Sequence, residues 1–183
     1  MSGVIGQDLQ VESGKFGFPA HHVIQIKYYE HDDEVTVTNP SSSAAGPWVN
    51  ILSGAITMAN QSNKILITGV GSAGGSSITY EFAWRLVRMV GGSDQPVGGN
   101  RDPVGLFLGD YILMSGSASG ENAMTLSNTY LDTPNTENEI TYKLQCMSGE
   151  TSTVYVNRGY TTNDARTWAN SGNTTLTLME IQG

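Results

Sequence analysis

The chain has 183 residues, includes 22 glycines and carries a net charge of −8. This length allows one domain with a substantial core, and its nine lysines and arginines form no basic cluster, which argues against nucleic acid as a partner. The apolar runs are far shorter than the ~18 residues of a membrane span, and the N-terminus lacks the basic and apolar segments of a signal peptide. We therefore expect a soluble protein that is made in a cytoplasm and inserts into no membrane.

Residues 1–20 are typical of an extended N-terminal arm, because they contain four glycines, a proline and no sustained hydrophobic period. A free terminal arm usually frays. We expect that a neighbouring subunit or a larger assembly holds this one, and that 21–183 form one domain.

Short stretches in which apolar and polar residues alternate follow the arm, separated by turn signals. The predicted strands are 22–29, 35–39, 48–58, 64–70, 79–90, 104–116, 122–132, 140–148, 153–159 and 174–182. A hairpin turn is expected at 30–34 and a long glycine-rich loop at 91–103. Roughly eight to ten short strands without a convincing helix are the pattern of a sandwich or barrel.

The glycines Gly69, Gly71 and Gly74 match G-x-G-x-x-G, the spacing of a dinucleotide-binding loop. That loop must lead into a helix whose N-terminus faces the pyrophosphate. Here the following residues, 76–87, alternate with period two. We therefore interpret the glycines as a flexible loop between two antiparallel strands and expect no nucleotide cofactor.

Other combinations of reactive residues are weak evidence for a metal site or a catalytic site. The segment "HDDE", 31–34, contains carboxylates that could bind Ca²⁺, but it lacks the spaced acids and glycine of a calcium loop. All three histidines lie within 21–31, and no G-x-S-x-G motif is present. The single cysteine, Cys146, is expected to be a buried strand thiol. We expect neither an enzyme nor a metal site.

Aromatic side chains offer one candidate ligand site. Trp168 lies in a polar loop, 163–173, with Tyr160, Asn163 and Asp164 nearby, and could stack on a sugar ring. The alternative is that Trp168 covers one end of the sandwich. For Trp84, on the strongest apolar face, ordinary core packing is expected.

The predicted strand 79–90 has apolar residues on both sides, because Ala83, Val87 and Met89 lie opposite the aromatic residues. A half-solvated sheet should have one polar face. We therefore expect these three residues to contact another subunit, as in a closely packed trimer.

Four pieces of the second half, in order, resemble a module found in bacteriophage virion proteins, especially those of marine phages. They are "YLDTP" (130–134), "ITYKLQ" (140–145), "TVYVNR" (153–158) and "TTLTLMEI" (174–181). Upstream, "HVIQIKYY", "NKILITG" and "RLVR" match its opening strands, so the resemblance covers about 20–181. Such modules look like jelly rolls of the tumour-necrosis-factor kind, and they typically form trimers on fibres, spikes or capsid decorations. This chain has no coiled-coil or repeat shaft, which argues against a long tail fibre.

The resemblance implies an all-β jelly-roll sandwich of antiparallel strands with an N-terminal arm. It further implies a homotrimeric structural protein on the virion surface, either a capsid decoration or head fibre or a short tail fibre or spike. Residues 1–20 would anchor it to capsid, tail or portal-region proteins. The alternative is a carbohydrate- or receptor-binding adhesin module of a tail fibre that contacts a host surface glycan.

Overall fold

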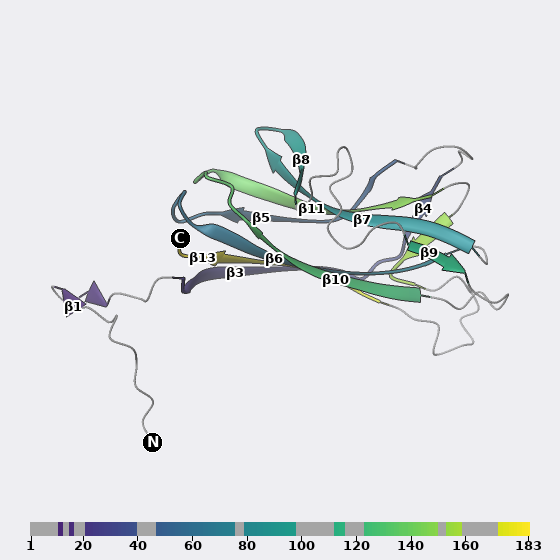
Figure 1. Ribbon diagram of the computed structural model, residues 1–183, viewed down its shortest axis with the longest axis horizontal. Coiled ribbons are helices and arrows are strands. Elements are labelled where there is room, and N and C mark those ends of the chain that lie inside the picture. The colour runs from purple at the N-terminus through teal and green to yellow at the C-terminus, as the bar shows by residue number, and fades with distance from the viewer. Residues whose placement is uncertain are drawn as a thin grey trace, which may run out of the picture.

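The protein folds into two antiparallel β-sheets that pack face to face as a sandwich, consistent with a jelly roll (Figure 1). The predicted all-β class is therefore confirmed. The structure is a computed structural model, and it describes residues 11–12, 15–16, 21–39, 47–75, 79–97, 112–115, 123–149, 153–158 and 172–183. Along these ranges there is no helix with the length and apolar composition to cross a membrane.

One layer is a six-stranded sheet, in which β13 and β12 both pair with β6, while β3 and β4 lie outside them and β10 pairs with the other edge of β6. Its strands are β3 (Val23–His31), β4 (Val35–Thr38), β6 (Lys64–Gly75), β10 (Ala123–Asp132), β12 (Thr153–Val156) and β13 (Thr174–Ile181).

The other layer is a five-stranded sheet with the order β5-β11-β7-β8, in which β9 also pairs with β7. Its strands are β5 (Val49–Thr57), β7 (Thr79–Val90), β8 (Ser93–Val97), β9 (Ile112–Ser115) and β11 (Glu139–Ser148). The sequence missed β8, which lies inside the expected loop at 91–103. A separate two-stranded ladder within the arm joins β1 (Val11–Glu12) to β2 (Lys15–Phe16).

In the six-stranded sheet, two neighbouring strand positions are each filled by two successive strands with a break between them. β12 and β13 occupy successive positions along the same edge of β6, because β12 pairs with residues 73–75 and β13 with residues 64–70. Their outer partners β4 and β3 are likewise successive and run in the same direction. The expected hairpin turn at 30–34 is therefore wrong, and residues 32–34 form a break within one edge of the sheet.

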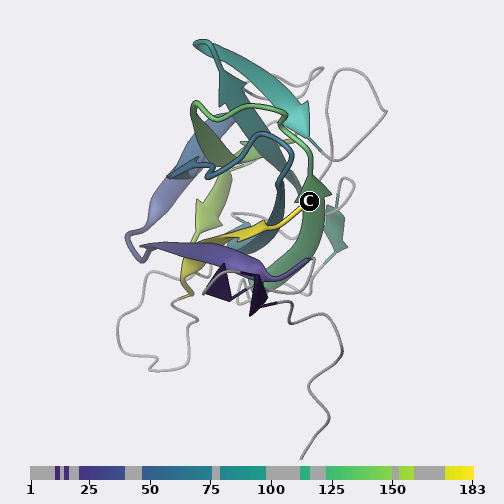
Figure 2. The ribbon, with the colours of Figure 1, turned by 90° about the vertical axis from the view of Figure 1, so that its left-hand side faces the viewer.

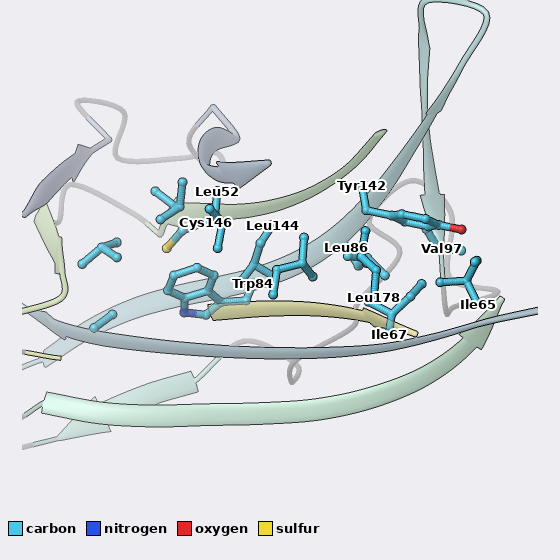
Figure 3. Close-up of a cluster of buried hydrophobic side chains, with 14 of the residues drawn as sticks. Leu52, Ile65, Ile67, Trp84, Leu86, Val97, Tyr142, Leu144, Cys146 and Leu178 are labelled. Atoms are coloured by element: carbon cyan, nitrogen blue, oxygen red, sulfur yellow. The ribbon is translucent and has the colours of Figure 1, made fainter. Parts of the chain in front are cut away.

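The core lies between the two sheets, because every second side chain of a strand points to the same face. Figure 3 shows Trp84, Leu86, Leu144 and Leu178 between the ribbons of the two layers, and all four are fully buried. Figure 2 shows the layers from one end, with the strands of each sheet twisted around this interior.

The glycine motif lies in a strand and not in a loop, so that prediction is wrong. β6 continues through Gly69 and Gly71 as far as Gly75, and pairs with β10 along its length. A Cβ atom on Gly71 would lie 2.8 Å from Cζ2 of Trp84. Gly71 thus leaves room for an indole ring of the facing sheet, which is a packing role for the glycine.

Candidate functional site

The four predicted ligand contacts, Tyr160, Asn163, Asp164 and Trp168, all lie in 159–171, outside the described residues. The structure does describe the two ends of this segment. It leaves the sheet after β12, at Arg158, and returns at Gly172 before β13. The four residues therefore belong to a segment between two successive strands, and the described residues 157–158 and 172–174 form the base of that segment.

Asn157 joins the base of this segment to the rest of the sheet. Its backbone N–H donates to the Ser72 carbonyl over 2.8 Å, and its carbonyl accepts from Gly172 N–H over 3.0 Å, which closes the two ends of the segment on each other. Its Nδ2 donates to the His31 and Asp33 carbonyls over 2.9 and 3.0 Å. The amide of Asn157 therefore fills the break in the edge strand, where a backbone ladder would otherwise supply the partners.

The backbone of Asn157 also requires an unusual residue. Its φ is +62°, in the left-handed region that asparagine tolerates better than most side chains. The side chain is buried, and its Oδ1 accepts from the Thr174 hydroxyl over 2.8 Å. Asparagine thus combines the turn conformation with two N–H donors for the part-buried carbonyls of His31 and Asp33 and an acceptor for the buried Thr174 hydroxyl.

Two further contacts tie the ends of the segment to the edge of the sheet. Arg158 forms an ion pair of 2.9 Å with Glu34, and its guanidinium lies 4.1 Å from the ring centroid of Tyr155. On the returning side, Asn173 Nδ2 donates to the Glu30 carboxylate. The two residues that flank the segment, Arg158 and Asn173, are consequently tied to the edge of the sheet formed by β3, β4 and the break between them.

We predict that Asn157→Ala lowers the free energy of unfolding by about 2–3 kcal/mol, because two part-buried carbonyls and a buried hydroxyl lose their partner and alanine is strained at positive φ. Asn157→Gly should cost about 1 kcal/mol less, since glycine removes only the strain. Urea unfolding monitored by circular dichroism measures both. Equal losses for the two variants would contradict a backbone contribution at this position.

A second buried polar cluster connects the two layers. Asp132, at the end of β10, accepts two hydrogen bonds from Arg88 Nη1 of β7, each 2.9 Å long. It also accepts from the Tyr142 hydroxyl of β11 over 2.6 Å and from Thr133 N–H over 2.9 Å. The carboxylate is thus shared by both sheets, and it fixes the end of one strand against the facing layer.

Burial raises the pKa of the Tyr142 hydroxyl above its unperturbed 10.0, and the neighbouring Asp132 carboxylate raises it further. The unfolded chain therefore ionises this tyrosine first, so its contribution to stability is complete below pH 10 and is lost as the pH rises above it. We predict that the stability difference between wild type and Tyr142→Phe shrinks by about 1 kcal/mol from pH 10 to 11, because half of the unfolded tyrosine is already ionised at pH 10. Urea unfolding of both proteins at these two pH values tests this, and a constant difference would contradict it.

A third polar cluster lies at the end of the sheet where β13 finishes. Glu180 is fully buried, and its carboxylate accepts hydrogen bonds from Ala59 N–H, Asn63 Nδ2 and Gln25 Nε2 over 2.8, 2.6 and 2.6 Å. The carboxylate therefore ties β13 to β3 and to the connection between β5 and β6. The pattern of the sequence did not single out this residue.

The expected subunit contacts lie on the outer face of β7. Ala83 and Val87 are already buried within one chain, and Met89 is half-buried. Their burial therefore does not require a second subunit, and their role in an interface stays a prediction.

The cysteine and the tryptophans singled out in the sequence have packing roles where the structure describes them. Cys146 is buried in the core, as predicted, and burial raises the pKa of its thiol. Trp84 is fully buried, which confirms core packing, and the Arg85 guanidinium lies 4.3 Å from the ring centroid of Trp48. Within the ranges that the structure describes, no group of three or more His, Cys, Asp or Glu residues is arranged to hold a metal ion.

Comparisons with known proteins found no matching family model and no matching curated protein. Among solved structures, the chain is similar to the structure of infectious bursal disease virus Gx strain, with a TM-score of 0.46 and 8% identity over 93% of this chain and 41% of that one. It is also similar to the infectious bursal disease virus VP2 subviral particle, with a TM-score of 0.42 and 11% identity over 94% of this chain and 44% of that one. The chain thus spans less than half the length of either.

Proposed function

We propose that this protein is a structural component of a virion surface, anchored through residues 1–20 and displaying the segment 159–171. The observation that carries the proposal is the pairing of β3 with β13. Val23, where the arm joins the sandwich, pairs with Ile181, whereas His31 pairs with Thr174 beside the base of the segment. The arm and the segment therefore join opposite ends of the same strand pair, roughly 27 Å apart at ~3.4 Å per residue.

The pieces that carry the resemblance to phage virion modules support a shared framework. "YLDTP" and "ITYKLQ" contribute Asp132 and Tyr142 to the cluster that connects the sheets. "TVYVNR" contains Asn157, and "TTLTLMEI" contains the buried Glu180. Since these residues stabilise the sandwich, the resemblance concerns the scaffold, and the recognition chemistry is left to the segments it displays.

A particle-association experiment tests this proposal. Mass spectrometry of particles purified on a density gradient, from a culture that carries this gene, should find the chain in the particle band. A variant that lacks residues 1–20 should stay in the soluble fraction, with circular dichroism as the check on its fold. Full-length chain that sediments only with soluble protein would contradict the proposal.

The second candidate function is glycan binding by the displayed segment, as in a receptor-binding adhesin. It is favoured by the aromatic and polar residues Tyr160, Asn163, Asp164 and Trp168 between two ends that Asn157 and its neighbours hold in place. A glycan array should then give a signal that Trp168→Ala abolishes. Val90→Ala is the control, because this exposed side chain lies on β7 of the other sheet, outside the described base of the segment. Loss of signal in the control, or no signal for wild type, would argue against this function.

A further inference from the structure

The outer face of the six-stranded sheet carries a row of apolar side chains that crosses four strands. Ile26 of β3 pairs with Met179 of β13, which pairs with Leu66 of β6, which pairs with Leu131 of β10. The two ends of this row are the most exposed, with Ile26 at 56% and Leu131 at 45%. An apolar row that spans the width of a sheet is more than the scattered single residues found on any surface.

The next row on the same face is uncharged. Tyr28 pairs with Thr177, Thr177 with Thr68 and Thr68 with Thr129, and the last two hydroxyls lie 3.1 Å apart. Across the outward side chains that the structure describes on these four strands, the charged residues are Glu30 and Lys64, which cancel. The chain as a whole carries −8, so this face is nearly neutral on an otherwise acidic protein.

From this face we infer the site of self-association: a second copy of this chain packs on the outer face of β3, β13, β6 and β10. Two acidic copies repel each other over most of their surfaces, whereas a neutral face with an apolar row allows close approach. The inference rests on the homotrimer that the resemblance implies, and it does not depend on the virion role. It places the interface on the sheet opposite to Ala83, Val87 and Met89.

The dimensions of the face fit this role. Four strands spaced ~4.8 Å apart and 8 to 12 residues long, about ten on average at ~3.4 Å per residue, cover roughly 650 Å². Stable interfaces bury about 600–1,000 Å² on each partner. Tyr28, 58% exposed on β3, adds an aromatic side chain of the kind that is enriched at such contacts.

Charge substitutions at the two ends of the apolar row test the inference. Multi-angle light scattering with gel filtration at micromolar concentration should give wild type a multiple of 19.6 kDa. Ile26→Glu and, separately, Leu131→Glu should weaken association roughly 30-fold or more, because each places an unpaired carboxylate in the contact. Val90→Glu is the matched control, since this exposed valine lies on β7 of the other sheet, and it should leave the mass unchanged.

The possible results distinguish self-association itself from its location on the outer face of β3, β13, β6 and β10. Circular dichroism and thermal unfolding establish that the three variants remain folded, as expected for exposed positions. A wild-type monomer would contradict self-association altogether. A wild-type oligomer that persists in both Ile26→Glu and Leu131→Glu, or that dissociates in Val90→Glu, would overturn this interface alone.

Discussion

Asp132→Ala should lower the free energy of unfolding by about 3–5 kcal/mol, which is a large fraction of the stability of a typical domain. The substitution leaves Arg88 and the buried hydroxyl of Tyr142 without the carboxylate that they share. Arg88 is 20% exposed and Asp132 only 7%, so water can replace little of what is lost. Urea unfolding should show a lower midpoint at an unchanged slope.

The surface pair between Lys143 and Asp94 provides a matched control. Its nitrogen and oxygen lie 2.7 Å apart, at least as close as in the buried pair, but the Asp94 side chain is 39% exposed. Asp94→Ala should therefore cost less than about 1 kcal/mol. Similar losses for the two aspartate variants would contradict the idea that burial makes the Asp132 cluster important.

Trp84→Ala should cost about 4 kcal/mol, because a fully buried indole leaves a cavity that the surrounding strands cannot close. A substitution at Gly71, which packs against the Trp84 ring, should also lower the free energy of unfolding. Gly71→Val should cost about 3 kcal/mol, since its side chain would occupy the space of the ring. Both losses are measurable by chemical denaturation.

The double variant distinguishes this contact from general damage to β6. In the Trp84→Ala background the added methyl groups of Gly71→Val enter the cavity, so the second substitution should cost less than about 1 kcal/mol. Additive losses would mean that Gly71 is required for a reason other than the indole ring.

The alternation of side chains made most of the fold predictable. The stretch 79–90 alternates over its whole length and is a strand over that whole length, β7. The stretches 140–148 and 174–182 became β11 and β13 to within a residue or so. A pattern of period two is local, and it survives whichever strands later become neighbours.

The errors came from long-range contacts. The glycines of β6 suggested a loop, because nothing in the local sequence reveals that Trp84 packs on Gly71. Residues 30–34 suggested a hairpin, although the partners of β3 and β4 lie far along the chain in β13 and β12.

The polar residues of the site were harder to foresee. Asn157 follows a short strand and looks like any turn asparagine, and its importance appears only once the break at 32–34 lies beside it. Asp132 and Glu180 were within motifs used for the resemblance, but their burial depends on the packing of the sheets. The loop residues predicted to contact a ligand lie outside the described ranges.

Electron cryo-microscopy of intact particles tests whether this protein is a component of the virion surface. We predict copies of this sandwich on the particle surface, with residues 1–20 toward the particle, residues 159–171 away from it, and neighbouring copies in contact through the sheet that contains β6. Particles that contain no copy of the chain, or copies whose segment 159–171 faces the particle while the arm points into solvent, would contradict it.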